Sequence, residues 1–101
     1  MTRKLTVDER SALLSELNGW RASTDREAIQ CEYKFRDFNE AFGFMTRVAI
    51  KAEEIGHHPD WFNVYNEVKI TLRTHDLDGV TELDAQLARF IDEVARTMQP
   101  S

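Results

Sequence analysis

The sequence predicts an α+β fold in which three helices pack on one face of a four-stranded antiparallel sheet, in the order α-β-β-α-β-β-α. Three separated segments carry apolar residues every three or four positions, which is typical of helices with one buried face. Between these segments, apolar and polar residues alternate in short runs, which is typical of strands with one wet face. The strands come in consecutive pairs, and such pairs usually form antiparallel hairpins.

The first helix is predicted over residues 6–17, because Thr6 and Glu9 form the capping-box pattern that starts many helices. An asparagine–glycine pair follows and tolerates the left-handed backbone that ends helices. Residues 20–22 then indicate a short strand, with Trp20 either in the core or at an interface. Residues 29–35 alternate between apolar and polar side chains, so the two strands should form a hairpin.

The second helix is predicted over residues 38–55 and is the longest. Asp37 marks its start, whereas Gly56 ends it and Pro59 prevents it from resuming. Its predicted buried stripe consists of Phe38, Ala41, Phe42, Met45, Ala49, Ala52 and Ile55.

Two further strands follow. Phe62 and Val64 should point to one side, with Phe62 in the core, and residues 68–72 alternate. A tight turn at Asn66 and Glu67 would make these strands a hairpin, and one unbroken strand with a bulge at Asn66 is the alternative.

The last helix should begin at Thr81, with Asp84 as its capping partner. Residues 98–101 are expected to fray. The buried face of this last helix is predicted to consist of Leu83, Leu87, Phe90, Ile91, Val94 and Met98.

The composition is that of one globular domain, which we assign to residues 1–101. The net charge is −5 and the basic residues are scattered, which disfavours direct nucleic-acid binding. No apolar run approaches the roughly 20 residues that span a bilayer, and no apolar signal segment follows the N-terminus. The single cysteine, Cys31, favours a reducing, cytoplasmic location. The short chain and its exposed sheet edges favour self-association.

The three histidines are the candidate chemical residues. His57 and His58 follow the helix-ending glycine, and His75 ends the last predicted strand. Helix ends and strand ends form the mouths of layered domains, and histidine transfers protons near neutral pH. The adjacent pair could instead cap the helix C-terminus. Spacing alone leaves a catalytic role and a capping role equally open.

A metal site is the rival interpretation, and the spacing disfavours it. Zinc usually takes three or four ligands that converge on one ion, whereas adjacent residues such as His57 and His58 rarely do. Cys31 is expected to face the core. We therefore predict an acid/base site without a metal.

Three other residues are expected to support the histidines. Glu53 lies four positions before His57, a spacing that places side chains together on a helix, whereas its neighbour Glu54 should face solvent. Trp61 follows the histidine loop and could wall a flat heteroaromatic ligand. Asp84 would either only cap the last helix or also contact the site.

The run from Ala52 to Asp76, which contains Gly-His-His-Pro-Asp-Trp, closely resembles the signature of the pterin-4a-carbinolamine dehydratase family. In animals this family is also known as the dimerisation cofactor of a hepatocyte nuclear factor. The resemblance covers nearly the whole chain. Gly56 departs from it, because some members carry an acidic or polar residue there. The residues that fit the family pattern are Glu53, His57, His58, Pro59, Trp61, Tyr65, His75 and Asp84.

The resemblance implies a 4a-hydroxytetrahydrobiopterin dehydratase, which removes water from the pterin product of aromatic amino-acid hydroxylases. It also implies that the pterin is the substrate and that no cofactor or metal is needed. His57 and His75 would transfer protons, and His58 would hold the pterin or act as base. Glu53 would orient His57, Asp84 would support His75, and Trp61 would flank the ring.

The resemblance further implies a homodimer or homotetramer. Animal members stabilise dimers of a transcription factor, so a partner of that kind is a second expectation. The alternative function is therefore a protein without enzymatic activity that binds pterin or stabilises a transcription-factor dimer.

Overall fold

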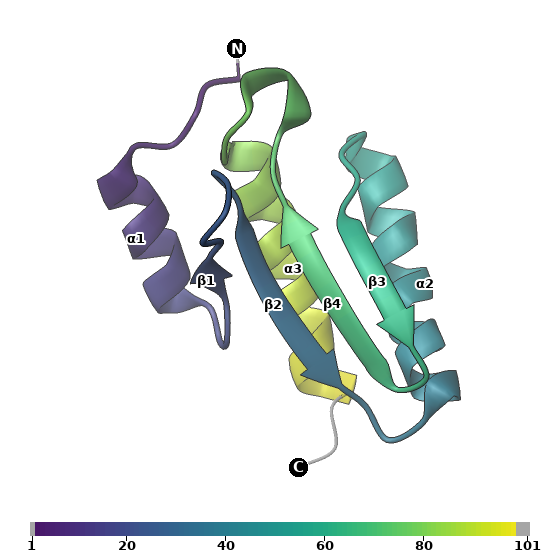
Figure 1. The fold of residues 1–101 in the computed structure, drawn as a ribbon. Coiled ribbons are helices and arrows are strands. Elements are labelled where there is room, and N and C mark those ends of the chain that lie inside the picture. Colours follow the sequence, from purple (N-terminus) through teal and green to yellow (C-terminus); the bar gives the residue numbers. More distant parts are fainter. Residues whose placement is uncertain (1, 99–101) are drawn as a thin grey trace.

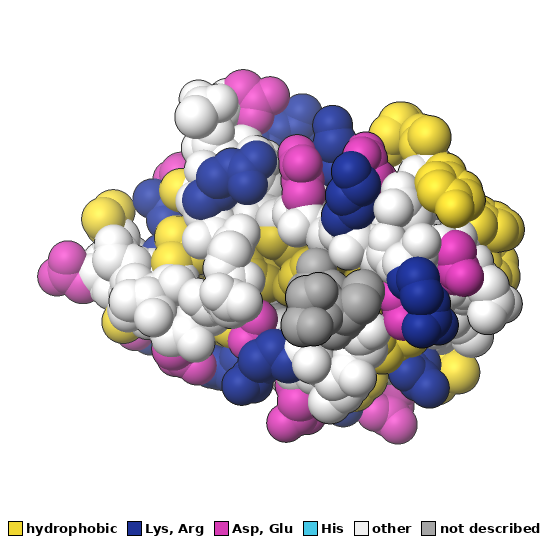
Figure 2. All heavy atoms as spheres, turned by 90° about the horizontal axis from the view of Figure 1, so that it is seen from below, with side chains coloured by type: hydrophobic (Ala, Val, Ile, Leu, Met, Phe, Trp, Pro, Cys, Tyr) yellow, Lys and Arg dark blue, Asp and Glu magenta, His cyan; other side chains and the backbone are white. Residues whose placement is uncertain are grey.

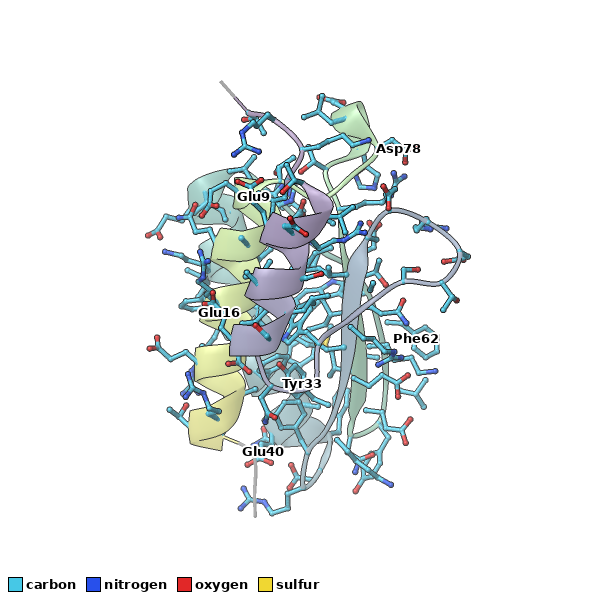
Figure 3. All side chains as sticks on the ribbon, turned by 90° about the vertical axis from the view of Figure 1, so that its left-hand side faces the viewer. Glu9, Glu16, Tyr33, Glu40, Phe62 and Asp78 are labelled. Carbon is cyan, nitrogen blue, oxygen red and sulfur yellow. The ribbon has the colours of Figure 1, made fainter. Side chains whose placement is uncertain are left out.

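In a computed structural model that describes residues 2–98, four strands form one antiparallel sheet in the order β1-β2-β4-β3. Figures 1 and 3 show the three helices on one face of this sheet, so the predicted fold class and element order are confirmed. The elements are α1 (Val7–Glu16), β1 (Arg21–Ala22), β2 (Ile29–Lys34), α2 (Phe38–Ile55), β3 (Asp60–Val64), β4 (Glu67–Leu72), the 3₁₀ turn η1 (His75–Leu77) and α3 (Glu82–Met98).

The central strands β2 and β4 are not consecutive in the chain. They pair over their full length, from Ile29 opposite Leu72 to Lys34 opposite Glu67. Alternate residues of both strands are buried beneath the helices, as the period-two pattern predicts. Between them the chain forms α2 and β3, so this pairing brings distant parts of the sequence together.

Helix α1 begins with the predicted capping box. The Thr6 hydroxyl accepts a hydrogen bond from the Glu9 amide, and the Glu9 carboxylate accepts one from the Thr6 amide. Arg3 donates two more to the same carboxylate, at 2.8 Å each. These hydrogen bonds, those from Arg3 first, lower the pKa of Glu9 to about 2.

Helix α2 has the predicted bounds, but its buried stripe was predicted only in part. Phe38 and Phe42 are 48% and 55% exposed, whereas Phe44 and Val48 are fully buried. The Phe44 ring packs against Phe35 at a centroid distance of 4.8 Å. Apolar residues line both sides of this helix, so their spacing did not show which side faces the sheet.

The hairpin between β3 and β4 is confirmed, and the bulged-strand alternative is wrong. Its two-residue loop is Tyr65 and Asn66 rather than Asn66 and Glu67, with Tyr65 in the left-handed region at φ 49°. The prediction that Phe62 lies in the core is also wrong. It is 58% exposed on the sheet face opposite the helices, as Figure 3 shows, with the Lys69 ammonium 5.9 Å from its ring centroid.

Two further sequence predictions concern residues 98–101 and Trp20. The fraying expected of residues 98–101 falls largely outside the described residues. Trp20 belongs to the core, where its indole nitrogen donates a hydrogen bond to the Tyr33 hydroxyl. Within residues 2–98, no helix is long and apolar enough to cross a membrane.

Candidate active site

The ends of four secondary-structure elements meet at one end of the molecule. Figure 1 shows the end of α2, the start of β3, the end of β4 and the start of α3 gathered there, and the predicted histidines lie on the connections between them. Together they form a pocket of about 340 Å³. Its lining residues are Gly56, His57, His58, Pro59, Asp60, Thr74, His75, Asp76 and Leu83.

Gly56 directs the His57 side chain into the protein interior. It ends α2 in the left-handed conformation at φ 68°, and its amide donates to the carbonyls of Ala52 and Glu53. The His57 amide also donates to the Ala52 carbonyl, at 3.1 Å. This turn reverses the chain at the helix end, so the His57 side chain is buried instead of continuing along the helix surface.

The buried partner of His57 is Asp84. The His57 Nε2 atom lies 2.5 Å from Asp84 Oδ1, and Asp84 is fully buried. The other carboxylate oxygen, Oδ2, accepts hydrogen bonds from the Thr74 hydroxyl and the Thr81 amide, both at 2.9 Å. Both oxygens of the carboxylate are therefore satisfied, as a buried charge requires.

This arrangement fixes the orientation of the His57 ring. An ionised carboxylate can only accept, so the hydrogen bond places a proton on Nε2. No hydrogen bond to His57 Nδ1 occurs within the described part of the chain. That nitrogen is therefore the one with which the ring can exchange a proton with a ligand.

His58 pairs with Glu53, at 2.9 Å between Nε2 and Oε1. The prediction that Glu53 orients His57 is therefore wrong. The four-residue spacing applies to a continuous helix, and the left-handed Gly56 interrupts the helix before His57. Both side chains of the observed pair are largely exposed, His58 by 63% and Glu53 by 82%.

His75 opens the 3₁₀ turn that follows β4, rather than ending the strand itself. Its Nε2 atom lies 3.3 Å from Oδ2 of Asp60, the first residue of β3. The prediction that Asp84 supports His75 is wrong, because Asp84 is buried against His57. Asp60 is the site residue that sequence reasoning missed. Its place immediately before Trp61 in an alternating strand was the available signal, since it puts the two on opposite sheet faces.

Trp61 does not line the pocket. It lies opposite Ile70 in the sheet, on the face covered by the helices, and its half-buried ring packs against the core. Its expected position beside a ligand ring is therefore not the one observed. Thr74 and Thr81 are further residues that the sequence did not assign to the site, although Thr81 was predicted to cap α3.

The rest of the described chain offers no competing chemical centre. Within residues 2–98, no group of three or more histidine, cysteine, aspartate or glutamate side chains could hold a metal ion. Burial raises the pKa of the Cys31 thiol, which disfavours the reactive thiolate. The pocket itself supplies positioned imidazoles and carboxylates, the groups that general acid/base catalysis uses.

Comparisons with known proteins identify the family of this chain. Residues 3–94 match the family described as Pterin 4 alpha carbinolamine dehydratase. A "Putative pterin-4-alpha-carbinolamine dehydratase" of Paraburkholderia xenovorans is 62% identical over 94 residues, covering 93% of this chain and 98% of the relative. One from Burkholderia multivorans is 59% identical over 101 residues, covering 100% and 99%.

Solved structures share the fold. A crystal structure of a "transcriptional coactivator/pterin dehydratase" from Brucella melitensis superposes with a TM-score of 0.90 at 48% identity, covering 92% of this chain and 99% of that one. A pterin dehydratase-like protein identified as a RuBisCO assembly factor of the alpha-carboxysome has a TM-score of 0.65 at 24% identity, covering 77% and 90%, and shares the fold alone. The family match and the close relatives show that this chain belongs to the pterin-4a-carbinolamine dehydratase family.

Proposed function

We propose that this protein is a 4a-hydroxytetrahydrobiopterin dehydratase that works by histidine acid/base catalysis. One observation carries the proposal: three histidines open into a single pocket, and one of them is hydrogen-bonded to a fully buried carboxylate. Membership of the dehydratase family supports the same reaction. The substrate is the hydroxylated pterin that aromatic amino-acid hydroxylases release, and the product feeds tetrahydrobiopterin recycling in the cytoplasm.

The reaction needs one proton donor and one proton acceptor. The bond between carbon 4a and the hydroxyl oxygen breaks, and the leaving oxygen takes a proton from an acid. Nitrogen 5 of the pterin gives its proton to a base, and a double bond forms between nitrogen 5 and carbon 4a. The products are water and quinonoid dihydropterin. Positioned acid/base groups typically accelerate such steps by about 10²–10⁴-fold.

The three histidines suit these tasks in different ways. His57 and His75 transfer protons at the 4a-hydroxyl group in this proposal, and His58 holds the pterin or serves as base. Asp84 accepts a hydrogen bond from the Nε2–H group of His57, which leaves Nδ1 for the substrate. A fixed ring orientation lowers the cost of reaching the reactive geometry.

The test is the rate at which 4a-hydroxytetrahydropterin decays with and without the protein, followed by absorbance. We expect the wild type to accelerate the decay, and His57→Ala and His75→Ala each to lose about 10²–10⁴-fold of that acceleration. Glu93→Gln, on the exposed side of α3, is the matched control and should retain full activity. No acceleration by the folded wild type would overturn the proposal. Pterin binding without turnover would favour the alternative function instead.

We also propose that the chain forms a homodimer or homotetramer. Two exposed apolar surfaces support this. The first, the α2 stripe, consists of Phe38, Phe42 and Ile50. The second, the β3 edge, consists of Phe62 and Val64, alternate residues of the edge strand β3. All five side chains are about half exposed or more. Figure 2 shows hydrophobic side chains gathered at the edge of the molecule where α2 and β3 lie. Surfaces of this kind mark protein contacts, and a transcription-factor partner remains the second candidate occupant of the α2 stripe.

A further inference from the structure

We propose that Asp60 is a positioning residue for His75. In this proposal the Asp60 carboxylate holds the imidazole ring at the pocket and stabilises its protonated form, so that His75 can give a proton to a bound ligand. The proposal rests on the dehydratase function, and it gives the start of β3 a role in that function.

The pairing of β3 with β4 places Asp60 next to His75. Asp60 opens the strand and lies opposite Thr71 of β4. Four residues beyond Thr71, the chain enters η1 with His75. The strand pairing therefore brings the Asp60 carboxylate to the His75 ring, with 3.3 Å between Oδ2 and Nε2. Both side chains line the pocket.

Asp60 also completes a pattern across the site. Each histidine contacts one carboxylate, and the three carboxylates differ in exposure: Asp84 is fully buried, the Asp60 side chain is 45% exposed, and that of Glu53 is 82% exposed. Water and salt screen the outermost pair most strongly. The His75 pair is screened less, because about half of each side chain is covered.

Among the charged groups around His75, Asp60 is the carboxylate that contacts its ring. The ionisable groups that line the pocket with it are His57, His58, Asp60 and Asp76. Two of these are histidines, which repel a protonated His75 whenever they are protonated themselves. Asp76 forms no ion pair with His75 within the described residues, although it is the next residue in the chain. Asp60 is thus the carboxylate in contact with the imidazolium.

The experiment compares Asp60→Asn with Asp78→Asn. Asp78 ends the η1 turn that His75 begins, and it also forms an ion pair, with Arg73. Because Asp78 does not line the pocket, this control removes the same charge outside the site. We expect Asp60→Asn to lower kcat by up to about fivefold, because partly exposed pairs contribute modestly, with little change in KM. Asp60→Glu should restore most of the rate, and Asp78→Asn should match the wild type.

Two readouts separate positioning from a merely structural role. In Asp60→Asn, kcat should fall while KM stays close to that of the wild type, because the change acts on proton transfer by His75 and not on pterin binding. In a His75→Ala background, Asp60→Asn should have no further effect on rate, because Asp60 acts through His75. Additive losses in the double variant, or a kcat of Asp60→Asn equal to that of Asp78→Asn, would overturn the proposal.

The two proposals can fail separately. If the wild type accelerates the decay and Asp60→Asn behaves like Asp78→Asn, the dehydratase function stands and the role of Asp60 is wrong. If the wild type is inactive, nitrogen-15 NMR of the histidine rings still tests the contact. The His75 ring signals should then be displaced in Asp60→Asn but not in Asp78→Asn, and identical spectra of the two variants would refute the contact.

Discussion

At the scale of single residues, the site depends on one buried carboxylate. Asp84 accepts hydrogen bonds on both oxygens, from His57 on one side and from Thr74 and Thr81 on the other. It therefore joins the end of α2, the end of β4 and the start of α3. A residue that was predicted as a helix cap is at once a cap and the partner of the buried histidine.

Asp84→Asn should damage both stability and turnover. If the NH₂ group takes the place of Oδ2, it faces the donor of the Thr81 amide, and two buried donors oppose each other. If it takes the place of Oδ1, His57 can accept from it only by moving the ring proton from Nε2 to Nδ1, which leaves the wrong tautomer at the pocket. A buried donor left without a partner costs about 1–3 kcal/mol, so the midpoint of urea unfolding should fall by a matching amount. The rate of 4a-hydroxytetrahydropterin decay should fall with it. Glu93→Gln, on the solvent side of the same helix, is the control. Equal unfolding midpoints for the two variants would contradict the expectation.

The meeting of the three histidines at one pocket was readable from the sequence, whereas the carboxylate partner of each ring was not. His57, His58 and His75 line one pocket, as their spacing suggested. The partner of each ring depends on backbone turns that no spacing rule contains. Gly56 redirects His57 toward the interior, and the approach of β3 to η1 depends on the strand register. For this reason Glu53 was assigned to the wrong histidine and Asp60 was not assigned at all.

At the scale of elements, the start of α1 responds to pH. Hydrogen bonds from Arg3 and from the Thr6 amide hold the pKa of Glu9 at about 2, below its ordinary value of 4.5. A lowered pKa in the folded state means that the ionised group adds stability above pH 4.5, and that this stability is lost as the pH falls toward 2.

Glu9→Gln should therefore melt at a lower temperature than the wild type at pH 6, and the difference should shrink steadily between about pH 4.5 and about pH 2. Thermal unfolding followed by circular dichroism at a series of pH values measures this difference. Glu93→Gln serves as the control and should show no such trend, since it forms no ion pair in the described structure. A melting difference that is constant with pH would show that Glu9 acts without its charge.

The buried residues were predictable in elements with one apolar face but not in elements with two. The alternation in β2 and β4 placed their buried residues correctly, because each strand has one wet side. In α2, phenylalanines lie on both sides, and only packing against Phe35 and Tyr33 shows that Phe44 is the buried one. The pairing of β2 with β4 is set by contacts between distant segments, which local patterns do not record.

At the scale of the whole molecule, the two exposed apolar surfaces predict the assembly state. Phe42→Asp on the α2 stripe and Val64→Asp on the β3 edge each place a charge in a proposed contact. Light scattering should give the wild type a mass of two or four times 11.8 kDa. Each variant that disrupts a real contact should lower that mass, and the double variant should be monomeric.

The assembly prediction has a matched control. Glu93→Gln lies outside both surfaces and should leave the mass unchanged. If either single variant alone gives monomers, one surface carries the whole contact and the assembly is a dimer. If the wild type itself is monomeric at concentrations used for the rate assay, the self-association proposal is wrong.

The bond between His57 and Asp84 also sets the order in which the protein can become active during synthesis. Its two residues are 27 positions apart, and Asp84 belongs to the last helix of the fold. A growing chain on the ribosome presents both strands of the β3–β4 hairpin and all three histidines before α3 has emerged. Until α3 docks, the His57 ring lacks its Asp84 partner, so the proposed acid/base site is completed last.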